Sequence, residues 1–187
     1  MNHADAVALI AEAVGGHVGA WADLGAGDGT FTRALAELIG PASPIYAVDR
    51  DARALASLAR RTKSDAARIV TVVADFSRSF ELPGLVAPAL DGVLLANALH
   101  FVRDQSAVLA RLATWLEPGG RIVVIEYDRR GANPWVPHPI PVARLGAIAA
   151  AAGLAAPIVT ARRPSDYGGD LYVAVLESAG PAAGPAV

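Results

Sequence analysis

A cluster of three glycines, Gly25, Gly27 and Gly29, constrains this 187-residue chain more than any other feature. The cluster stands between a short apolar segment, residues 21–24, and a helical pattern over residues 31–39. Glycine lets the backbone turn sharply and lets a ligand approach the main chain closely. The sequence therefore predicts a tight turn from a strand into a helix, with a ligand-binding site at that turn.

Strand and helix patterns alternate along most of the chain, which is typical of a sheet built from strand–helix–strand units. We expect helices over residues 4–14, 31–39, 51–63, 104–116 and 142–152, and strands over residues 21–24, 45–48, 68–73, 91–96, 121–127, 158–162 and 171–176. The loop between the last two strands is too short for a crossover helix, so we expect these strands to pair antiparallel. Residues 1–178 are expected to form a single domain, and residues 179–187 a flexible tail.

Composition and charge exclude several classes of function. The formal net charge is −2, with 18 acidic and 16 basic residues, which argues against a protein that mainly holds a nucleic acid. The absence of cysteine excludes thiolate nucleophiles and cysteine-based metal sites. The four histidines show no metal-ligand spacing, so we expect no metal. Without a signal-peptide pattern or an apolar stretch long enough to span a bilayer, we expect a cytoplasmic protein.

The glycine spacing distinguishes between kinds of nucleotide site. A dinucleotide-binding turn would carry its third glycine at position 30, where this chain has Thr30, and the Gly-Lys-Ser/Thr of a phosphate-binding P-loop is absent. Asp49 follows the second expected strand, 20 residues after Gly29. A carboxylate there reaches the ribose hydroxyls of a nucleoside lying across the strand ends. The alternative is that Asp49 only caps the helix that starts at Asp51.

Five segments, in order, resemble the motifs of the class I S-adenosylmethionine-dependent methyltransferases. They are Asp23-Leu-Gly-Ala-Gly-Asp-Gly29, Tyr46-Ala-Val-Asp49, Val73-Ala-Asp75-Phe76, Asp91-Gly-Val-Leu-Leu-Ala-Asn97-Ala-Leu-His100 and Leu116-Glu-Pro-Gly-Gly-Arg-Ile-Val-Val-Ile125. The resemblance runs from about residue 19 to residue 177 and is strongest to the small-molecule group that includes ubiquinone/menaquinone-type methyltransferases. It implies a Rossmann-like, doubly wound α/β fold. That fold has a mostly parallel seven-stranded sheet, an antiparallel seventh strand and helices on both faces.

The resemblance also implies a set of residues that bind S-adenosylmethionine, which would leave as S-adenosylhomocysteine. Gly25 and Gly27 would contact the methionine part, and Asp23 would organise the loop or meet the ammonium group. Asp49 would hold the ribose, and Arg50 would cover the adenine. The remaining predicted cofactor residues follow the third and fourth strands. Asp75 would accept a hydrogen bond from the adenine amine, and Phe76 would offer its backbone N–H nearby. Asn97 would face the ligand-binding crevice.

The acceptor side of the site is less specific in sequence. His100 follows the fourth strand and is a candidate acid–base residue, or else a histidine that shapes the pocket. In the proline-rich segment after the fifth strand, Trp135 and His138 are candidate acceptor contacts, and Arg129 or Arg130 would attract an acidic acceptor. The alternative for this segment is that it only packs over the sheet edge.

These features favour an enzyme that transfers a methyl group to a small molecule by in-line displacement. A catalytically silent binding or partner protein with the same fold is the alternative, and a nicotinamide oxidoreductase comes third because of Thr30. Little chain precedes the first strand to act as a lid. We therefore expect either an open acceptor pocket or a homodimer in which a second subunit completes it.

Overall fold

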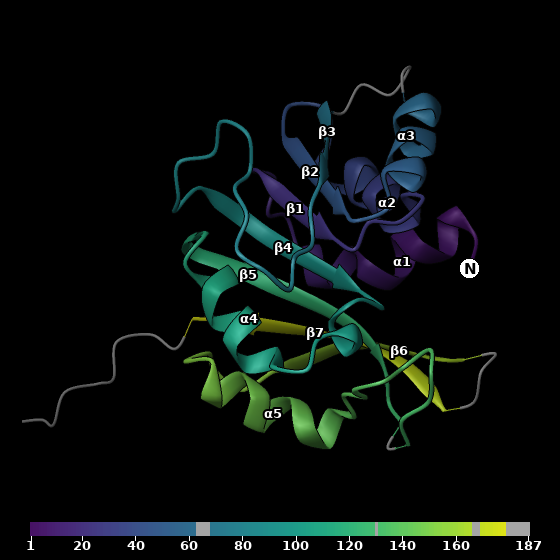
Figure 1. The fold of residues 1–187 in the computed structure, drawn as a ribbon, viewed down its shortest axis with the longest axis vertical. Coiled ribbons are helices and arrows are strands. Elements are labelled where there is room, and N and C mark those ends of the chain that lie inside the picture. The colour runs from purple at the N-terminus through teal and green to yellow at the C-terminus, as the bar shows by residue number, and fades with distance from the viewer. Residues whose placement is uncertain (63–67, 130, 166–168, 179–187) are drawn as a thin grey trace, which may run out of the picture.

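A seven-stranded sheet forms the centre of the computed structural model, which describes residues 1–62, 68–129, 131–165 and 169–178 (Figure 1). The strands lie in the order β3-β2-β1-β4-β5-β7-β6. Their bounds are β1 Trp21–Leu24, β2 Pro44–Asp49, β3 Arg68–Val73, β4 Leu90–Ala96, β5 Leu116–Tyr127, β6 Ile158–Pro164 and β7 Asp170–Glu177. The predicted tail, residues 179–187, lies outside the described residues, as does Arg130.

The pairing of the strands confirms the predicted fold class. Strands β1 to β5 pair parallel, whereas β7 is antiparallel to both β5 and β6. The chain order reverses beside β1, where β2 pairs on one side and β4 on the other. In open α/β sheets, ligands bind beyond the carboxyl ends of the strands at such a reversal. The topology therefore places the glycine turn, which follows β1, at the expected binding crevice.

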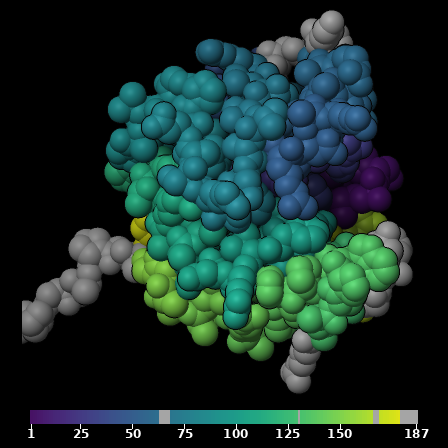
Figure 2. Space-filling model, in the orientation of Figure 1, coloured from purple at the N-terminus to yellow at the C-terminus, as the bar shows by residue number. Residues whose placement is uncertain are grey.

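Helices cover both faces of the sheet. Three of them, α1 (His3–Val14), α2 (Thr30–Ile39) and α3 (Ala52–Arg61), lie on one face, and their apolar sides bury Ile10, Leu35 and Leu58. On the other face, α4 (Gln105–Ala113) and α5 (Val142–Ala151) pack through Leu109 and Leu145. Figure 2 shows this second face, with teal and green segments over it. Burial on both faces explains why residues 92–96 of β4 and residues 122–125 of β5 are wholly apolar.

Side-chain caps define where several helices begin. Asp51 accepts hydrogen bonds from the backbone N–H groups of Arg53 and Ala54, and Asp104 accepts one from that of Ala107. Asp104 is therefore the N-cap of α4. Because Asp51 caps α3, that role does not fall to Asp49.

Two local predictions differ from the structure. Helix α4 ends at Ala113 rather than residue 116, and β5 begins at Leu116 rather than residue 121. Leu116 pairs with Leu90, and the register shifts before Gly92 pairs with Arg121, so the Pro-Gly-Gly segment lies within an irregular strand. A short 3₁₀ helix, η1 (Leu99–Phe101), follows β4, where the sequence indicated no separate element.

In the part of the chain that the structure describes, no helix has the length and apolar character needed to cross a membrane.

Candidate active site

A cavity of about 410 Å³ lies at the carboxyl ends of β1, β2, β3 and β4. Seven of the eight predicted cofactor residues line it, namely Gly25, Gly27, Asp49, Arg50, Asp75, Phe76 and Asn97. Asp51, Ala54, Ser77 and the η1 end (Phe101 and Val102) complete much of the wall. The fold thus brings together residues from four separate motifs, and the eighth, Asp23, lies beneath them.

The glycine turn has a different steric requirement at each position. A Cβ on Gly29 would lie 2.2 Å from a methyl carbon of Leu58, so this glycine lets α3 pack against the turn. A Cβ on Gly25 would lie 2.7 Å from that of Ala98. At Gly27 the backbone is left-handed, with a φ of 54°, yet a Cβ would meet nothing within 4 Å. Gly27 therefore borders open space, where a ligand can approach the main chain.

Asp49 links the glycine turn to the second strand. One carboxylate oxygen accepts a hydrogen bond of 2.8 Å from the backbone N–H of Gly27, and the other accepts one of 2.8 Å from that of Asp51. A carboxylate offers about four acceptor positions, so both oxygens retain capacity for a ligand. Asp49 thus shapes the turn and presents an acceptor to the cavity.

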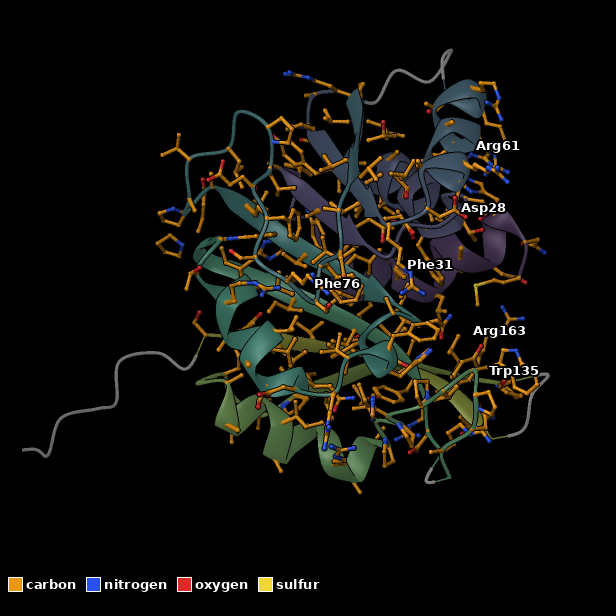
Figure 3. The ribbon with its side chains drawn as sticks, in the orientation of Figure 1. Asp28, Phe31, Arg61, Phe76, Trp135 and Arg163 are labelled. Carbon is orange, nitrogen blue, oxygen red and sulfur yellow. The ribbon has the colours of Figure 1, made fainter. Side chains whose placement is uncertain are left out.

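The third motif is held by local bonds and by α4. The Asp75 carboxylate accepts hydrogen bonds from the Ser77 hydroxyl at 2.6 Å and the Ser77 N–H at 3.0 Å. The hydroxyl bond is the main cause that lowers the pKa of Asp75 below its usual value. Arg111 of α4 donates to the Phe76 carbonyl, which fixes this segment against the helix. An ionised carboxylate therefore lines the cavity next to Phe76, which is labelled in Figure 3.

Asp23 does not line the cavity, because its side chain is buried below the glycine turn with 1% exposure. One carboxylate oxygen accepts a hydrogen bond of 2.6 Å from the Thr32 hydroxyl of α2. Burial is the main cause that raises the pKa of Asp23 to about 7, and the nearby Asp49 charge adds to it. Its second oxygen, Oδ1, is buried without a hydrogen-bond partner among the described residues.

Asn97 lies just beyond β4 in a strained conformation. Its φ is 51°, the one positive φ outside glycine in the described residues, and its backbone N–H donates to Ile125 of β5 at 2.8 Å. Its side-chain Oδ1 is buried and finds no hydrogen-bond partner among the described residues. Strain of this kind is often held at functional sites.

A second cavity of about 290 Å³ shares Asn97 with the first. Its walls come from Met1 before α1, the start of α2 (Thr30 and Phe31), the end of β5 (Tyr127), and the adjoining ends of β6 and β7, with Arg163, Pro164, Ser165 and Leu171. In the view of Figure 3, Phe31 lies between Phe76 and Arg163. Asn97 therefore stands where two neighbouring cavities meet.

His100 lies in η1, is 2% exposed, and lines neither cavity. Its ring Nδ1 lies 2.7 Å from one Glu126 oxygen, and its backbone N–H donates to the other at 3.1 Å. Glu126, at 1% exposure, thus holds η1 onto the end of β5. The catalytic role of His100 stays a prediction. Its bonds to Glu126 also hold in place the turn that carries Phe101 and Val102.

The predicted acceptor contacts lie apart from both cavities. Trp135 is 77% exposed and lies at the edge of the molecule in Figure 3. The backbone of His138 bonds to His100 and to the Gln105 side chain, which ties the proline-rich segment over η1. Neither Trp135 nor His138 lines a described cavity, so the contact with an acceptor stays a prediction.

Sequence reasoning missed several residues of the site. Glu126 had a signal, because it is the only charged residue in the apolar end of its strand, Ile122–Tyr127. Arg163 and Phe31 had none, since their place depends on how β6, β7 and α2 meet around the carboxyl ends of β4 and β5.

The arrangement fits a ligand that is both a nucleoside and an amino acid. Asp49 and Asp75 supply anionic acceptors for sugar hydroxyls and a base amine. The unpartnered oxygen of Asn97 fits an ammonium group, and the open space at Gly27 fits close contact with the main chain. No group of His, Asp and Glu side chains in the described residues has the geometry to hold a metal ion.

A sheet of order 3-2-1-4-5-7-6, with an antiparallel β7 and a cavity above the glycine turn, defines a class I methyltransferase fold. The family model described as a methyltransferase domain matches residues 22–122, more than half of the chain. The chain belongs to this family. It is an S-adenosylmethionine-dependent methyltransferase, with S-adenosylmethionine as its methyl donor.

Solved structures show the same fold. The 1,6-didemethyltoxoflavin N1-methyltransferase of Burkholderia thailandensis, with bound 1,6-didemethyltoxoflavin and S-adenosylhomocysteine, is 25% identical with a TM-score of 0.70, and the match covers 95% of this chain and 78% of that one. A methyltransferase from Clostridium acetobutylicum is 10% identical with a TM-score of 0.70, over 96% and 93% of the chains. The arsenic(III) methyltransferase of Chlamydomonas reinhardtii is 16% identical with a TM-score of 0.71, over 87% and 64%. The chain thus spans less than two thirds of the algal enzyme. No curated protein matches the chain.

Proposed function

We propose that this methyltransferase acts on a small-molecule acceptor held in the second cavity. The observation that carries the proposal is that Asn97 lines both cavities, so a ligand in one lies next to a ligand in the other. A volume of about 290 Å³ suits a small molecule. The Burkholderia relative, whose structure holds a small heterocycle together with S-adenosylhomocysteine, supports this reading.

Each residue of the first cavity would contact a different part of the cofactor. Asp49 would hold the ribose hydroxyls, Arg50 would cover the adenine, and Asp75 would accept from the adenine amine beside the N–H of Phe76. Gly25 and Gly27 would lie against the methionine part. Asn97 would meet its ammonium group through its unpartnered oxygen, and Asp23 would organise the loop from below or reach the ammonium group through a water molecule.

When bound, S-adenosylmethionine would supply an electrophilic methyl group for in-line transfer to the acceptor and would leave as S-adenosylhomocysteine. The chain's residues align the two ligands and exclude water, which is the main contribution that this chemistry asks of a protein. Asn97 and the glycine turn provide that alignment.

The Asn-x-x-His segment that ends at His100 supports a place in the ubiquinone/menaquinone-type group. If His100 acts as a base, Glu126 would hold the Nδ1 proton and leave Nε2 to accept one. A homodimer that completes the acceptor pocket also stays a prediction, and light scattering at working concentration would test it.

Turnover tests the proposed function. Protein incubated with S-adenosylmethionine and a panel of small metabolites is expected to release S-adenosylhomocysteine only with a particular acceptor, as measured by chromatography. The Asp49→Ala variant is expected to lose at least tenfold in activity at limiting cofactor. Cofactor binding without turnover on any small molecule would instead favour the catalytically silent alternative.

A further inference from the structure

The second cavity differs from the first in charge. Arg163 is the only charged side chain among its described lining residues. The first cavity is lined by three carboxylates, Asp49, Asp51 and Asp75, with Arg50 as its cation. Arg163 lines the cavity whereas its ion-pair partner Asp5 does not, so the lining favours an anionic ligand. The charged side chains that line the two cavities are therefore mainly of opposite sign.

Arg163 forms one ion pair and keeps hydrogen-bond donors for a ligand. Its Nη1 lies 3.2 Å from the Asp5 carboxylate of α1, and both side chains are about 40% exposed. A guanidinium has five N–H donors in a planar fork, so one such pair leaves donors for a ligand. An ion pair at this exposure is weak, whereas a fork of two parallel bonds to a ligand carboxylate is strong.

The other walls suit a flat apolar body. Phe31 and Tyr127 provide aromatic rings from α2 and β5, and Pro164 and Leu171 provide apolar surface from the ends of β6 and β7. The cavity is small, at about 290 Å³. Aromatic rings pack well against flat apolar ligands, so one or two fused rings fit this lining.

We propose that the second cavity binds an aromatic acid, with its anionic group on Arg163, its ring between Phe31 and Tyr127, and its methylated edge toward Asn97. This inference rests on the proposed function and names the class of acceptor. A negative acceptor is also attracted to the positive sulfonium of the cofactor in the adjoining cavity.

A different occupant would also place a carboxylate near Arg163, namely the amino-acid end of the cofactor itself. The two occupants make different predictions for Arg163→Gln. An acceptor on Arg163 means that the variant loses acid binding and keeps cofactor affinity. A cofactor carboxylate on Arg163 means that the variant loses cofactor affinity.

The probe is a panel of hydroxybenzoates and hydroxynaphthoates, each paired with its neutral carboxamide, added to protein saturated with S-adenosylhomocysteine. Binding is measured by ligand-observed NMR and calorimetry. At least one acid is expected to bind tenfold or more tightly than its amide, and Arg163→Gln is expected to abolish that preference. Arg162→Gln is the matched control, because Arg162 pairs with Asp128 at 2.9 Å and lines neither cavity.

The proposal is overturned if no acid is preferred to its amide, if Arg163→Gln keeps the preference, or if Arg163→Gln weakens S-adenosylhomocysteine binding more than Arg162→Gln does. Failure of the wild-type protein to bind S-adenosylhomocysteine would contradict the proposed function instead. Titrating the wild-type protein with S-adenosylhomocysteine therefore distinguishes a failure of this inference from a failure of the proposed function.

Discussion

Gly27 contributes both to the shape of the turn and to the space for a ligand. Its left-handed backbone lets its N–H reach the Asp49 carboxylate, and the space above its missing side chain belongs to the cavity. The need for glycine at this position was predictable from the strand–turn–helix pattern. The different requirement at Gly29, contact with Leu58, was not, because it depends on how α3 packs.

Gly27→Ala is expected to weaken S-adenosylmethionine binding at least tenfold, since the new methyl group enters the cavity. The strain of φ 54° should also lower the free energy of unfolding by about 1 kcal/mol. Gly153→Ala is the control, because Gly153 has a φ of 74°, open space at its Cβ and no place in either cavity. Equal cofactor affinity in the two variants, by calorimetry, would contradict the role of Gly27.

Asp23 predicts a pH dependence of stability. Its pKa is raised from 3.8 to about 7 by burial, so the folded state binds this proton more tightly than the unfolded state. Its contribution to the free energy of unfolding therefore falls as pH rises through that window and is lowest above it. Asp23→Asn keeps an acceptor for Thr32 and removes the titration.

The difference in unfolding free energy, Asp23→Asn minus wild type, is expected to rise from pH 5 to pH 8 by a few kcal/mol, since one pKa unit corresponds to about 1.4 kcal/mol. Urea denaturation at each pH measures it. A difference that stays constant or falls with pH would show that ionising Asp23 does not lower the free energy of unfolding, which would contradict the raised pKa.

At the scale of elements, the end of β4 and the end of β5 act together. Glu126 of β5 accepts from the backbone and approaches the ring of His100, and Asn97 donates its N–H to Ile125. These bonds fix the turn and η1, which supply Asn97, Phe101 and Val102 to the first cavity. The site therefore depends on a buried carboxylate that lines neither cavity.

Glu126→Ala is expected to lower the free energy of unfolding by about 2–3 kcal/mol, because it leaves two buried groups of His100 without a partner. Glu126→Gln should restore most of this, since an amide can bond to both groups by reversing the histidine tautomer. If His100 is the base, Glu126→Gln would still lose activity and change the pH–rate profile. Full stability in Glu126→Ala, by urea denaturation, would contradict the positioning role.

Most elements were predictable because their patterns are local. β-branched runs, helical spacing and glycine stops predicted the seven strands and five α-helices of the described residues, with every bound except the start of β5 within about three residues. The start of β5 was not predictable, because Leu116 extends the strand only by pairing with Leu90 across an irregular register. The same limit applies to η1, which is held by Glu126, 26 residues further along the chain.

At the scale of the whole molecule, the reversal of strand order places all four cofactor motifs at one edge of the sheet. The sequence predicted this cavity well, since its residues sit at strand ends. It did not predict the second cavity, whose lining joins α2, β5, β6 and β7 through tertiary packing. Trp135 and His138 are predicted from their place after the fifth strand, and the structure places them outside both cavities.

The most direct measurement is a calorimetric titration of S-adenosylmethionine into the wild-type protein and into two folded variants. The wild type is expected to bind one equivalent, and Asp49→Ala at least tenfold more weakly. Asp104→Ala, which removes a cap of α4 outside the cavity, should keep the wild-type affinity. No binding by the wild type, or equal affinity in Asp49→Ala, would contradict the assignment of this cavity to the methyl donor.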